Sequence, residues 1–485
     1  MNPSFIVIAI VLIYMAAMLG VGWYASKKVK GNDDFLVAGR RLGPFMMAGT
    51  LAATEAGGGS SMGVAEKAFG EWGMSAGWYV LAMAITLVLL AVVAPRLRRS
   101  EVRTVPEFFT KRYGEKTGLL SAFLFIIPLV GLTATQFIAS SVILSVMTGF
   151  NFTLSAIIVC AVVTVYSVLG GLWSVTLTDI IQWCLIVGGL LLAIPFALDV
   201  AGGYSAVMSS LPEAKASFTE GTGLGTIVTL VIMYFASFAV GQESVQRYFA
   251  ARDEKAAAWG SILAALSYVF FAFMPALLGV IAYSMVQRGL MDGALIESEG
   301  ARYVLPLLAV QAFPKWLVGI VFAALISATM SSADSDLLAA GSIVANDIYA
   351  KKINPKATEQ SILKLTRWTM VVVALMALMV TLFHAESIVA LLMFSFSFRA
   401  AGAFVPYVLG HYVSRPGPGA AVSSITGCSF VVLLCEVMDF SIWGMQAIVL
   451  GILASAVCYG MAGWFFPWLL LKVTKESSEV VGDHG

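Results

Sequence analysis

Long apolar runs, separated by short polar breaks or by breaks containing glycine and proline, dominate this chain. A helix of about 20 apolar residues crosses the roughly 30 Å hydrocarbon core of a bilayer, and many of these runs are that long. Reading the runs against the breaks predicts thirteen membrane-spanning helices. Their ranges are 4–25, 43–69, 74–95, 119–149, 152–170, 175–198, 224–245, 256–286, 304–346, 367–384, 386–411, 418–436 and 441–471. The ninth range is too long for one plain span, so we expect it to include a short surface helix.

Composition supports this pattern. Of the 485 residues, 59% are hydrophobic and only 12% are charged, whereas soluble proteins carry about 25% charged residues. The loops are too short to hold a soluble domain, and the P-loop, GxSxG and HExxH motifs are absent. We therefore predict an all-α polytopic membrane protein that is not an enzyme and has no catalytic residues. With a net charge of +1, it is not drawn to nucleic acid.

Lysine and arginine are distributed unevenly between the two sets of alternating loops. One set contains 23 of the 29 basic residues and the other contains four. The basic set comprises loops 26–42, 95–118, 246–256, 346–367 and 412–418 and the C-terminal tail. Because cytoplasmic loops carry the excess of basic residues, we expect a multi-pass protein of the cell membrane with its N-terminus outside and its C-terminus in the cytoplasm.

The second predicted span contains the segment "AATEAGGGSSMG", residues 52–63, in which Glu55 precedes three consecutive glycines. Glycine costs about 1 kcal/mol relative to alanine within a helix, so this cluster favours local unwinding. Unwound backbone at membrane depth is tolerated where it faces protein or a wet cavity. An ionisable residue within a span also suggests function. The segment therefore predicts a cavity wall, the alternative being that the glycines serve close helix packing.

A second polar feature is "AALISATMSSADSDLL", residues 323–338. Ala328, Ser331, Ser332 and Ser335 follow the spacing i, i+3, i+4 and i+7, so they share one helix face. Serine hydroxyls and free carbonyls are hard oxygen donors that suit an alkali cation, and no cluster of soft ligands competes for another metal. The alternative is that these serines hydrogen-bond a neighbouring helix.

Other polar residues near the ends of the predicted spans allow two interpretations. Asp179, about one turn inside the sixth span, either caps the helix end or helps to bind a cation. Asp334 and Asp336 lie near the cytoplasmic end of the ninth span, where ordinary polar or ion-paired roles are open. The stretch 241–257 is predicted to be mostly cytoplasmic loop, with Gln242 as its one residue facing a cavity.

Together these stretches resemble the sodium:solute symporter family, which includes sodium-coupled glucose, proline, pantothenate and choline carriers. The segment "AALISATMSSADSDLLAAGSIVANDIY" is similar to the signature of the family. Four more stretches follow in the order of the family, namely "GRRLGPF", "TVPEFFTKRYG", "GGLWSVTLTDIIQ" and "GQESVQRYFAARD". The resemblance covers nearly the whole chain.

The resemblance implies a leucine-transporter-type fold of about 13 transmembrane helices, in which five spans repeat with inverted topology as five more. The first helix of each half would be broken at the midplane. The implied organisation is a first helix and cytoplasmic loop (1–42), a first repeat (43–198), an extracellular loop (199–223), a second repeat (224–411), two C-terminal helices (412–471) and a cytoplasmic tail (472–485).

The resemblance also implies sodium as the coupling ion, with no organic cofactor and no other metal. The residues matching the main sodium site of the family are Ala53, Ala56, Ala328, Ser331 and Ser332. A second sodium site, present in some members, matches Asp179, Ser331, Asp334 and Ser335.

The nature of the solute depends mostly on Glu55. The second span is most similar to the choline-carrier branch, which has a tryptophan at this position as part of an aromatic cage. The loss of that tryptophan argues against choline. A carboxylate instead suits an amine on an amino acid or polyamine, a urea-like or hydroxyl solute, or proton coupling. The candidate substrate-binding residues are Glu55, Gly57, Gly58, Gln136, Phe235, Phe238 and Gln242.

The expected function is therefore sodium-coupled symport of a small polar organic solute by alternating access. The expected partners are the solute and the lipid bilayer. Two alternatives remain open: an uncoupled or proton-coupled permease or channel, and a nutrient-sensing receptor that resembles a transporter.

Overall fold

The computed structural model describes residues 5–27, 31–383, 387–413, 417–438 and 447–464. Helices dominate this part of the chain, which contains no β-strand and only an isolated bridge between Leu42 and Ala251. The predicted tail (472–485) and both ends of the last predicted span lie outside the described residues.

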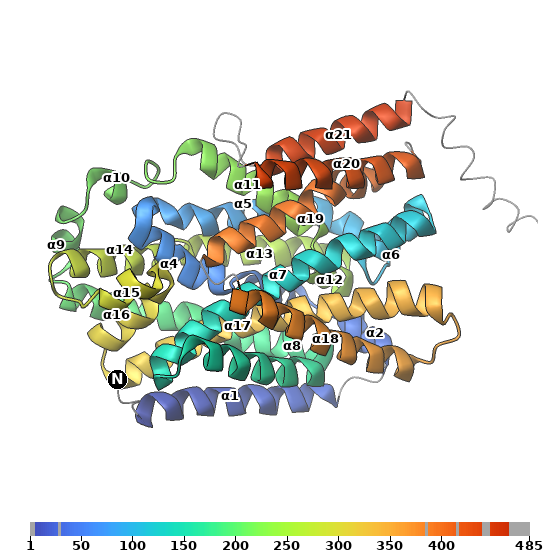
Figure 1. Cartoon of the computed structure of the whole chain (residues 1–485). Coiled ribbons are helices and arrows are strands. Elements are labelled where there is room, and N and C mark those ends of the chain that lie inside the picture. Colours follow the sequence, from blue (N-terminus) through green and yellow to red (C-terminus); the bar gives the residue numbers. More distant parts are fainter. Residues whose placement is uncertain (1–4, 28–30, 384–386, 414–416, 439–446, 465–485) are drawn as a thin grey trace, which may run out of the picture.

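The long helices follow the predicted order along the chain (Figure 1). They are α1 (Phe5–Ser26), α3 (Pro44–Glu55), α5 (Trp78–Arg99), α7 (Glu115–Thr148), α8 (Phe152–Val200), α11 (Leu224–Val240), α13 (Glu254–Phe271), α14 (Met274–Gln287), α17 (Lys315–Ser342), α18 (Glu359–Phe383), α19 (Ile388–Gly410), α20 (Pro418–Val437) and α21 (Ala447–Trp464). The short ones are α2 (Asn32–Val37), α4 (Val64–Lys67), α6 (Val105–Tyr113), α9 (Tyr204–Ser209), α10 (Glu213–Ala216), α12 (Gln242–Ala250), α15 (Ala294–Glu299) and α16 (Val304–Ala312).

Each of the thirteen predicted ranges contains helix. By length and apolar composition, nine described helical segments can cross a membrane, or ten if the bent pair α11 and α12 counts as one span. The number is smaller than thirteen because Gly59–Arg99 and Phe152–Val200 each cover parts of two predicted spans, and α21 falls among the shorter apolar helices. The ninth range contains a separate short helix, α16, as expected, but six of its nine residues are buried, so it is not a surface helix.

The chain bends sharply at two glycines, one at a predicted helix boundary and one inside the predicted span 224–245. At Gly171 the backbone of α8 has φ +61° and ψ −173°, so the long helix is two helices that meet at an angle. A Cβ atom at Gly171 would lie 2.5 Å from Cδ2 of Phe35, so glycine is required by packing as well. Between α11 and α12 the chain bends by 57° around Gly241.

The helix α17 forms the centre of the bundle. Every residue from Val321 to Ser342 is buried, serines and aspartates included. α17 packs against α8, α7 and α1, while α13 packs against α5 and α3. In Figure 1, α1 runs along one edge of the bundle, and α20 and α21 lie together along the opposite edge. This arrangement encloses the polar face of α17 on all sides.

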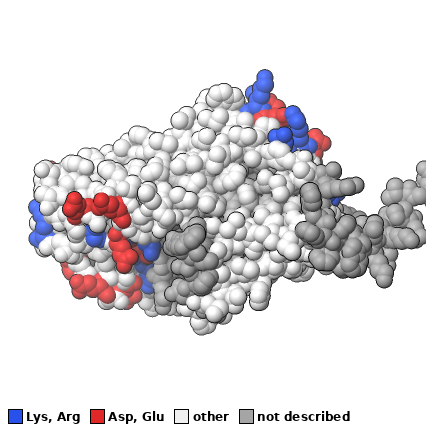
Figure 2. All heavy atoms as spheres, turned by 90° about the horizontal axis from the view of Figure 1, so that it is seen from above, with Lys and Arg blue, Asp and Glu red and all other residues white. Residues whose placement is uncertain are grey.

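Charged residues gather at the two ends of the molecule. On the face drawn in Figure 2, Lys, Arg, Asp and Glu lie at both ends, and the surface between them is almost free of charge. Many large apolar side chains are exposed, for example Ile13, Val92 and Leu375. In water such a surface would be costly, whereas hydrocarbon accepts it. The chain is therefore a multi-pass membrane protein.

The stretch after α11 differs from the expected cytoplasmic loop. Residues Gln242–Ala250 form the helix α12, and all nine of them are buried. The polar residues that suggested a loop instead have buried partners, because the guanidinium group of Arg247 reaches Ser335 Oγ at 2.5 Å and Thr50 Oγ1 at 3.4 Å. Tertiary pairing thus offsets the cost of burying this charge.

Candidate ion and solute site

The second span is broken where the sequence predicts it. α3 ends at Glu55, and Ala56 leaves helical geometry with φ −85° and ψ 47°. Helical backbone resumes as a wide π-type turn at Gly59–Gly63, which continues into α4. The Gly57 carbonyl accepts hydrogen bonds from Ser60 Oγ (3.1 Å) and Ser61 Oγ (2.9 Å). The two serines that follow the glycines thus stabilise the break.

The three glycines also permit close packing. None of them has a positive φ, so conformational freedom alone does not explain them. A Cβ atom would lie 2.7 Å from Ser332 Oγ at Gly57, 2.6 Å from the Ala139 Cβ at Gly58 and 2.1 Å from Leu392 Cδ1 at Gly59. Both interpretations of the cluster, the broken helix and the close packing, therefore apply to the same segment.

Oxygen atoms of α3 and α17 converge next to the break. Ser331 Oγ donates to the carbonyls of Ala53 (2.8 Å) and Ala328 (3.0 Å). Ser332 Oγ donates to the carbonyls of Thr54 (2.6 Å) and Ala328 (3.3 Å). The described residues contain no cluster of three or more His, Cys, Asp or Glu side chains arranged for a metal ion. This set of hydroxyls and carbonyls fits a hard alkali cation rather than a transition metal.

The structure places the five predicted sodium ligands in one neighbourhood. Ala53, Ala328, Ser331 and Ser332 are linked directly by the hydrogen bonds above, and Ala56 lies fully buried at the end of α3. Thr54, whose carbonyl accepts from Ser332, is an additional oxygen that the sequence comparison did not single out.

The residues of the predicted second sodium site also lie together, but with an arginine among them. Asp179 Oδ2 accepts a hydrogen bond from Thr50 Oγ1 at 2.5 Å and lies 3.8 Å from Nη2 of Arg247. The same Nη2 atom donates a hydrogen bond to Ser335 Oγ. The Ser335 hydroxyl in turn donates to the Ser331 carbonyl, and it lies 3.4 Å from Asp334 Oδ1. A fully buried guanidinium group thus supplies positive charge where a second cation would bind, and its repulsion opposes that cation.

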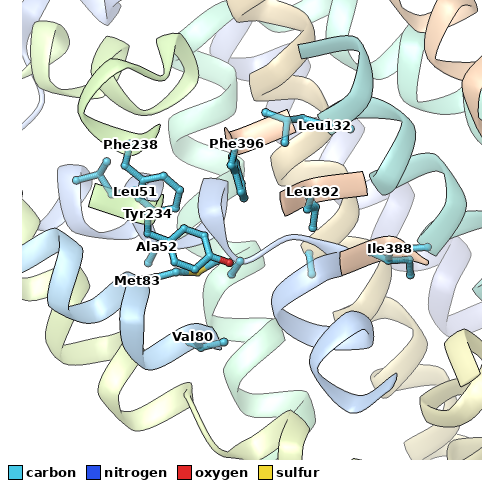
Figure 3. Close-up of a cluster of buried hydrophobic side chains, with 14 of the residues drawn as sticks. Leu51, Ala52, Val80, Met83, Leu132, Tyr234, Phe238, Ile388, Leu392 and Phe396 are labelled. Atoms are coloured by element: carbon cyan, nitrogen blue, oxygen red, sulfur yellow. The ribbon is translucent and has the colours of Figure 1, made fainter. Parts of the chain in front are cut away.

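A small cavity of about 20 Å³ lies beside the break. Its walls come from α3, α5, α7, α12, α17 and α19. The lining residues are Thr54, Glu55, Gly57, Gly59, Ser60, Tyr79, Met83, Leu132, Gln136, Glu243, Ser332, Asp336, Leu392 and Phe396. Figure 3 shows Leu392 and Phe396 on α19, Leu132 on α7 and Met83 on α5 around the broken second span. Because Ser332 belongs to both, the cavity and the ion site are contiguous.

Three carboxylates line this cavity. Glu55 accepts a hydrogen bond from Ser244 Oγ. Glu243 forms an ion pair with Arg399, whose Nη1 lies 2.5 Å from Oε1 of the glutamate. Asp336 is 4% exposed, and no hydrogen bond joins its carboxylate to another described residue. The cavity is therefore rich in carboxyl groups and hydrogen-bond acceptors.

Of the other predicted substrate-binding residues, Gln136 lines the cavity and Gly58 lies directly behind its wall, where its N–H donates to Gln136 Oε1 at 2.8 Å. Phe238 lies one layer further out and contacts the lining ring of Phe396. Phe235 packs edge-on against Phe404 instead.

Gln242 is also outside the lining. Its amide accepts from the Val105 N–H (2.8 Å) and donates to the Arg103 carbonyl (3.1 Å). It therefore ties α12 to the segment before α6.

Sequence reasoning did not select Glu243, Asp336, Arg399 or Tyr79 for the site. A usable signal existed for the charged residues, because each is an ionisable group in or next to an apolar run. Arg399 in particular interrupts the eleventh predicted span, "LLMFSFSFRAAGAFV". Asp336 was seen but interpreted as an ordinary group at a helix end, whereas the structure places it in the cavity wall.

Relatives of this chain are transporters. The osmoregulated proline transporter OpuE of Bacillus subtilis is 25% identical over 97% of this chain and 96% of its own length. The sodium/sialic acid symporter SiaT of Proteus mirabilis is 24% identical over 87% of this chain and 88% of its own length. The high-affinity choline transporter 1 of Caenorhabditis elegans is 27% identical over 78% of this chain and 68% of its own length.

Solved structures agree with the sequence comparisons on the fold. A Na+-coupled sialic acid symporter in a substrate-bound outward-open state superimposes with a TM-score of 0.81 at 21% identity, covering 96% of this chain and 98% of the other. Mhp1, a nucleobase-cation-symport-1 family transporter, matches with a TM-score of 0.55 at 14% identity, covering 88% of this chain and 92% of the other. The fold is therefore the leucine-transporter type. A model of the sodium:solute symporter family matches residues 35–427, so the chain belongs to that family, whose members are transporters rather than enzymes.

Proposed function

We propose that this protein uses the entry of sodium to import a small polar organic solute across the cell membrane. The observation that carries this proposal is the convergence of Ser331 and Ser332 on the carbonyls at the end of α3, directly beside the cavity. The break between α3 and α4 therefore supplies oxygen ligands for an ion on one side and part of the cavity lining for a solute on the other. Binding of either cargo orders the same segment, and this is the physical basis of coupling.

The proposed cycle begins with sodium arriving from outside between α3 and α17. It replaces the hydroxyl protons as the partner of the Ala53, Thr54 and Ala328 carbonyls and holds the end of α3 against α17. The solute then binds between Glu55 and the facing helices, and rocking of the helix bundle opens the site to the cytoplasm. Each positive charge that crosses 100 mV contributes about 2.3 kcal/mol, equivalent to roughly fifty-fold accumulation.

Other predictions extend this proposal. The N-terminus lies outside and the C-terminus in the cytoplasm. The 5+5 inverted repeat is supported by the two helix breaks, since the first helix of each half, α3 with α4 and α11 with α12, is interrupted. Asp179, Ser331, Asp334 and Ser335 remain the candidate second sodium site, but the charge of Arg247 works against it. An uncoupled permease and a nutrient sensor remain alternatives, and the intact hydroxyl and carbonyl set argues for coupling.

The substitution Ser332→Ala tests the ion site. It removes a hydroxyl that bonds two carbonyls, and a hydrogen bond to a charged group contributes about 1.5–3 kcal/mol. We therefore expect the sodium concentration for half-maximal uptake to rise about tenfold or more. The measurement is solute uptake into proteoliposomes as a function of external sodium.

Ser327→Ala is the matched control. Ser327 lies one turn earlier on α17, is equally buried, and bonds the carbonyl of Ala323 in its own helix at 2.7 Å. Its sodium dependence should match that of the unmodified protein. An unchanged sodium dependence in Ser332→Ala would remove this ion site, and flux without any sodium dependence would favour the uncoupled permease.

A further inference from the structure

The cavity lining holds three carboxyl groups and no basic side chain. The carboxyl groups are those of Glu55, Glu243 and Asp336. Arg399 lies behind the wall and pairs with Glu243 at 2.5 Å. Arg247, the other buried arginine nearby, lies 3.8 Å from Asp179 and donates to Ser335 Oγ and to the Glu243 carbonyl, and it is not part of the cavity lining. Two carboxylates, Glu55 and Asp336, therefore have no protein cation as a direct partner in the described structure.

Asp336 is the clearest sign of a missing partner. Its side chain is 4% exposed, it contributes to the cavity wall, and it accepts no hydrogen bond from any described residue. Burying an ionised carboxylate without a partner is costly, so such a group either takes up a proton or is completed by a bound ligand or ion. Glu55 has one oxygen bonded to Ser244, and no described residue bonds the other.

Three donors around the cavity are already used within the protein. The Gly58 N–H donates to Gln136, Ser60 Oγ donates to the Gly57 carbonyl, and Ser332 Oγ donates to the Thr54 carbonyl. The Tyr79 hydroxyl has no partner among the described residues, so it offers one neutral donor to a ligand. A carboxylate on the solute would find the Gln136 amide and the Tyr79 hydroxyl as donors, but it would also lie against the carboxyl groups of Glu55 and Asp336.

We propose that the solute is a small aliphatic dication with an amine or guanidinium group at each end and no carboxylate. One end pairs with Glu55 and the other with Asp336, through charge-assisted hydrogen bonds. Met83, Leu132 and Leu392 form apolar walls for the connecting methylene groups, and the rings of Tyr79 and Phe396 add cation–π attraction. The cavity itself encloses only about 20 Å³, so its walls must move apart to admit the solute, as alternating access requires. This inference rests on the proposed sodium-coupled transport.

The test compares three solutes of equal chain length. They are 1,4-diaminobutane, with two amines; 1-butylamine, with one; and 4-aminobutanoate, in which a carboxylate replaces the second aminomethyl group. We measure sodium-driven uptake of each into proteoliposomes containing the full chain, with proline as a fourth solute. We expect the half-saturating concentration of the diamine to be at least tenfold below those of the other three.

Substitutions of Glu55 and Asp336 test which carboxylate binds each end of the solute. Asp336→Asn and Glu55→Gln should each raise the half-saturating concentration of the diamine at least tenfold, and Asp336→Asn should affect 1-butylamine less. Glu66→Gln is the control, because Glu66 is a buried carboxylate of the same span that bonds Ser387 and lies outside the cavity lining. Thermal stabilisation by sodium alone shows that each variant is folded with its ion site intact.

The outcomes separate the two proposals. Sodium-driven uptake of proline or 4-aminobutanoate, without uptake of or competition by the diamine, would overturn the dication but leave sodium-coupled import in place. Unchanged diamine transport in an Asp336→Asn variant that sodium still stabilises would also overturn it. Sodium-independent flux of every solute, with no stabilisation by sodium, would instead reject the proposed function.

Discussion

Arg399 is the residue on which the charge pattern of the cavity most depends. Its guanidinium group is 1% exposed, donates to Ser237 Oγ at 2.6 Å and pairs with Glu243 at 2.5 Å. Removing one partner of a buried ion pair leaves the other charge uncompensated, at a cost of about 3–5 kcal/mol. We therefore expect Arg399→Gln to lower the thermal unfolding temperature of the purified protein markedly, and Arg399→Lys to lower it less.

The double variant Arg399→Met with Glu243→Gln separates charge from shape. It removes both charges together, and replacing a buried pair is often close to neutral for stability. Its unfolding temperature should recover most of the loss seen in Arg399→Gln. A double variant as unstable as the single one would mean that Arg399 acts through packing, for example against the ring of Phe396 at 5.0 Å, rather than through Glu243.

Single residues were predictable where their chemistry is local. Glu55 and the serines of α17 stand out because each is a polar group inside an apolar run, and their roles follow from helix spacing. Asp336 and Glu243 were not assigned to the cavity because a position near a helix end does not show which way a side chain points. Arg247 was missed for a related reason: its partners, Asp179 and Ser335, come from helices distant in sequence.

At the scale of elements, three glycines in the second span serve both the break in the helix and its close packing against neighbouring helices. Gly58 is the sharpest case, since a Cβ there would lie 2.6 Å from the Ala139 Cβ on α7, and neither atom belongs to a flexible side chain. Gly58→Ala should therefore separate α7 from the break and abolish most sodium-driven uptake. Overpacking of this kind typically costs about 1–3 kcal/mol.

A compensating change gives this prediction its control. Ala139→Gly in the Gly58→Ala background removes the opposing methyl group and should restore a substantial part of the uptake. Gly70→Ala, in the same region but with open space around the added carbon, should leave uptake unchanged. If the double variant stays as inactive as Gly58→Ala, the glycine is needed for backbone motion rather than for space.

Helices were predictable from the sequence wherever a run of apolar residues determines the local structure. All thirteen predicted ranges contain helix, because in a bilayer a run of apolar residues satisfies its backbone only as a helix or in a closed sheet. The exception is α12, whose sequence "QESVQRYFA" has the polarity of a loop. It is helical and buried because the rest of the fold supplies partners for its charges, and this information is absent from the local pattern.

At the scale of the whole molecule, the distribution of loops agrees with one consistent topology. α9, α10 and α15 lie at one end of the bundle, where α1 begins, and α2 and α6 lie at the other (Figure 1). These are the two sets of loops that the basic residues distinguish. We expect the end that carries α2 and α6 to face the cytoplasm, because lysine and arginine are retained on the side of synthesis.

Labelling of single cysteines tests this orientation. Glu299 ends α15 at the first end, and Lys356 lies at the other end, in the turn between the π-type helix Ile343–Ile353 and α18; both are exposed. In a Cys184→Ser background, which removes the exposed native thiol, we expect a membrane-impermeant maleimide to label Glu299→Cys in intact cells. Lys356→Cys should react only after the cells are permeabilised. The reverse pattern would invert the topology, and it would require sodium and solute to approach the cavity from the end that carries α2 and α6.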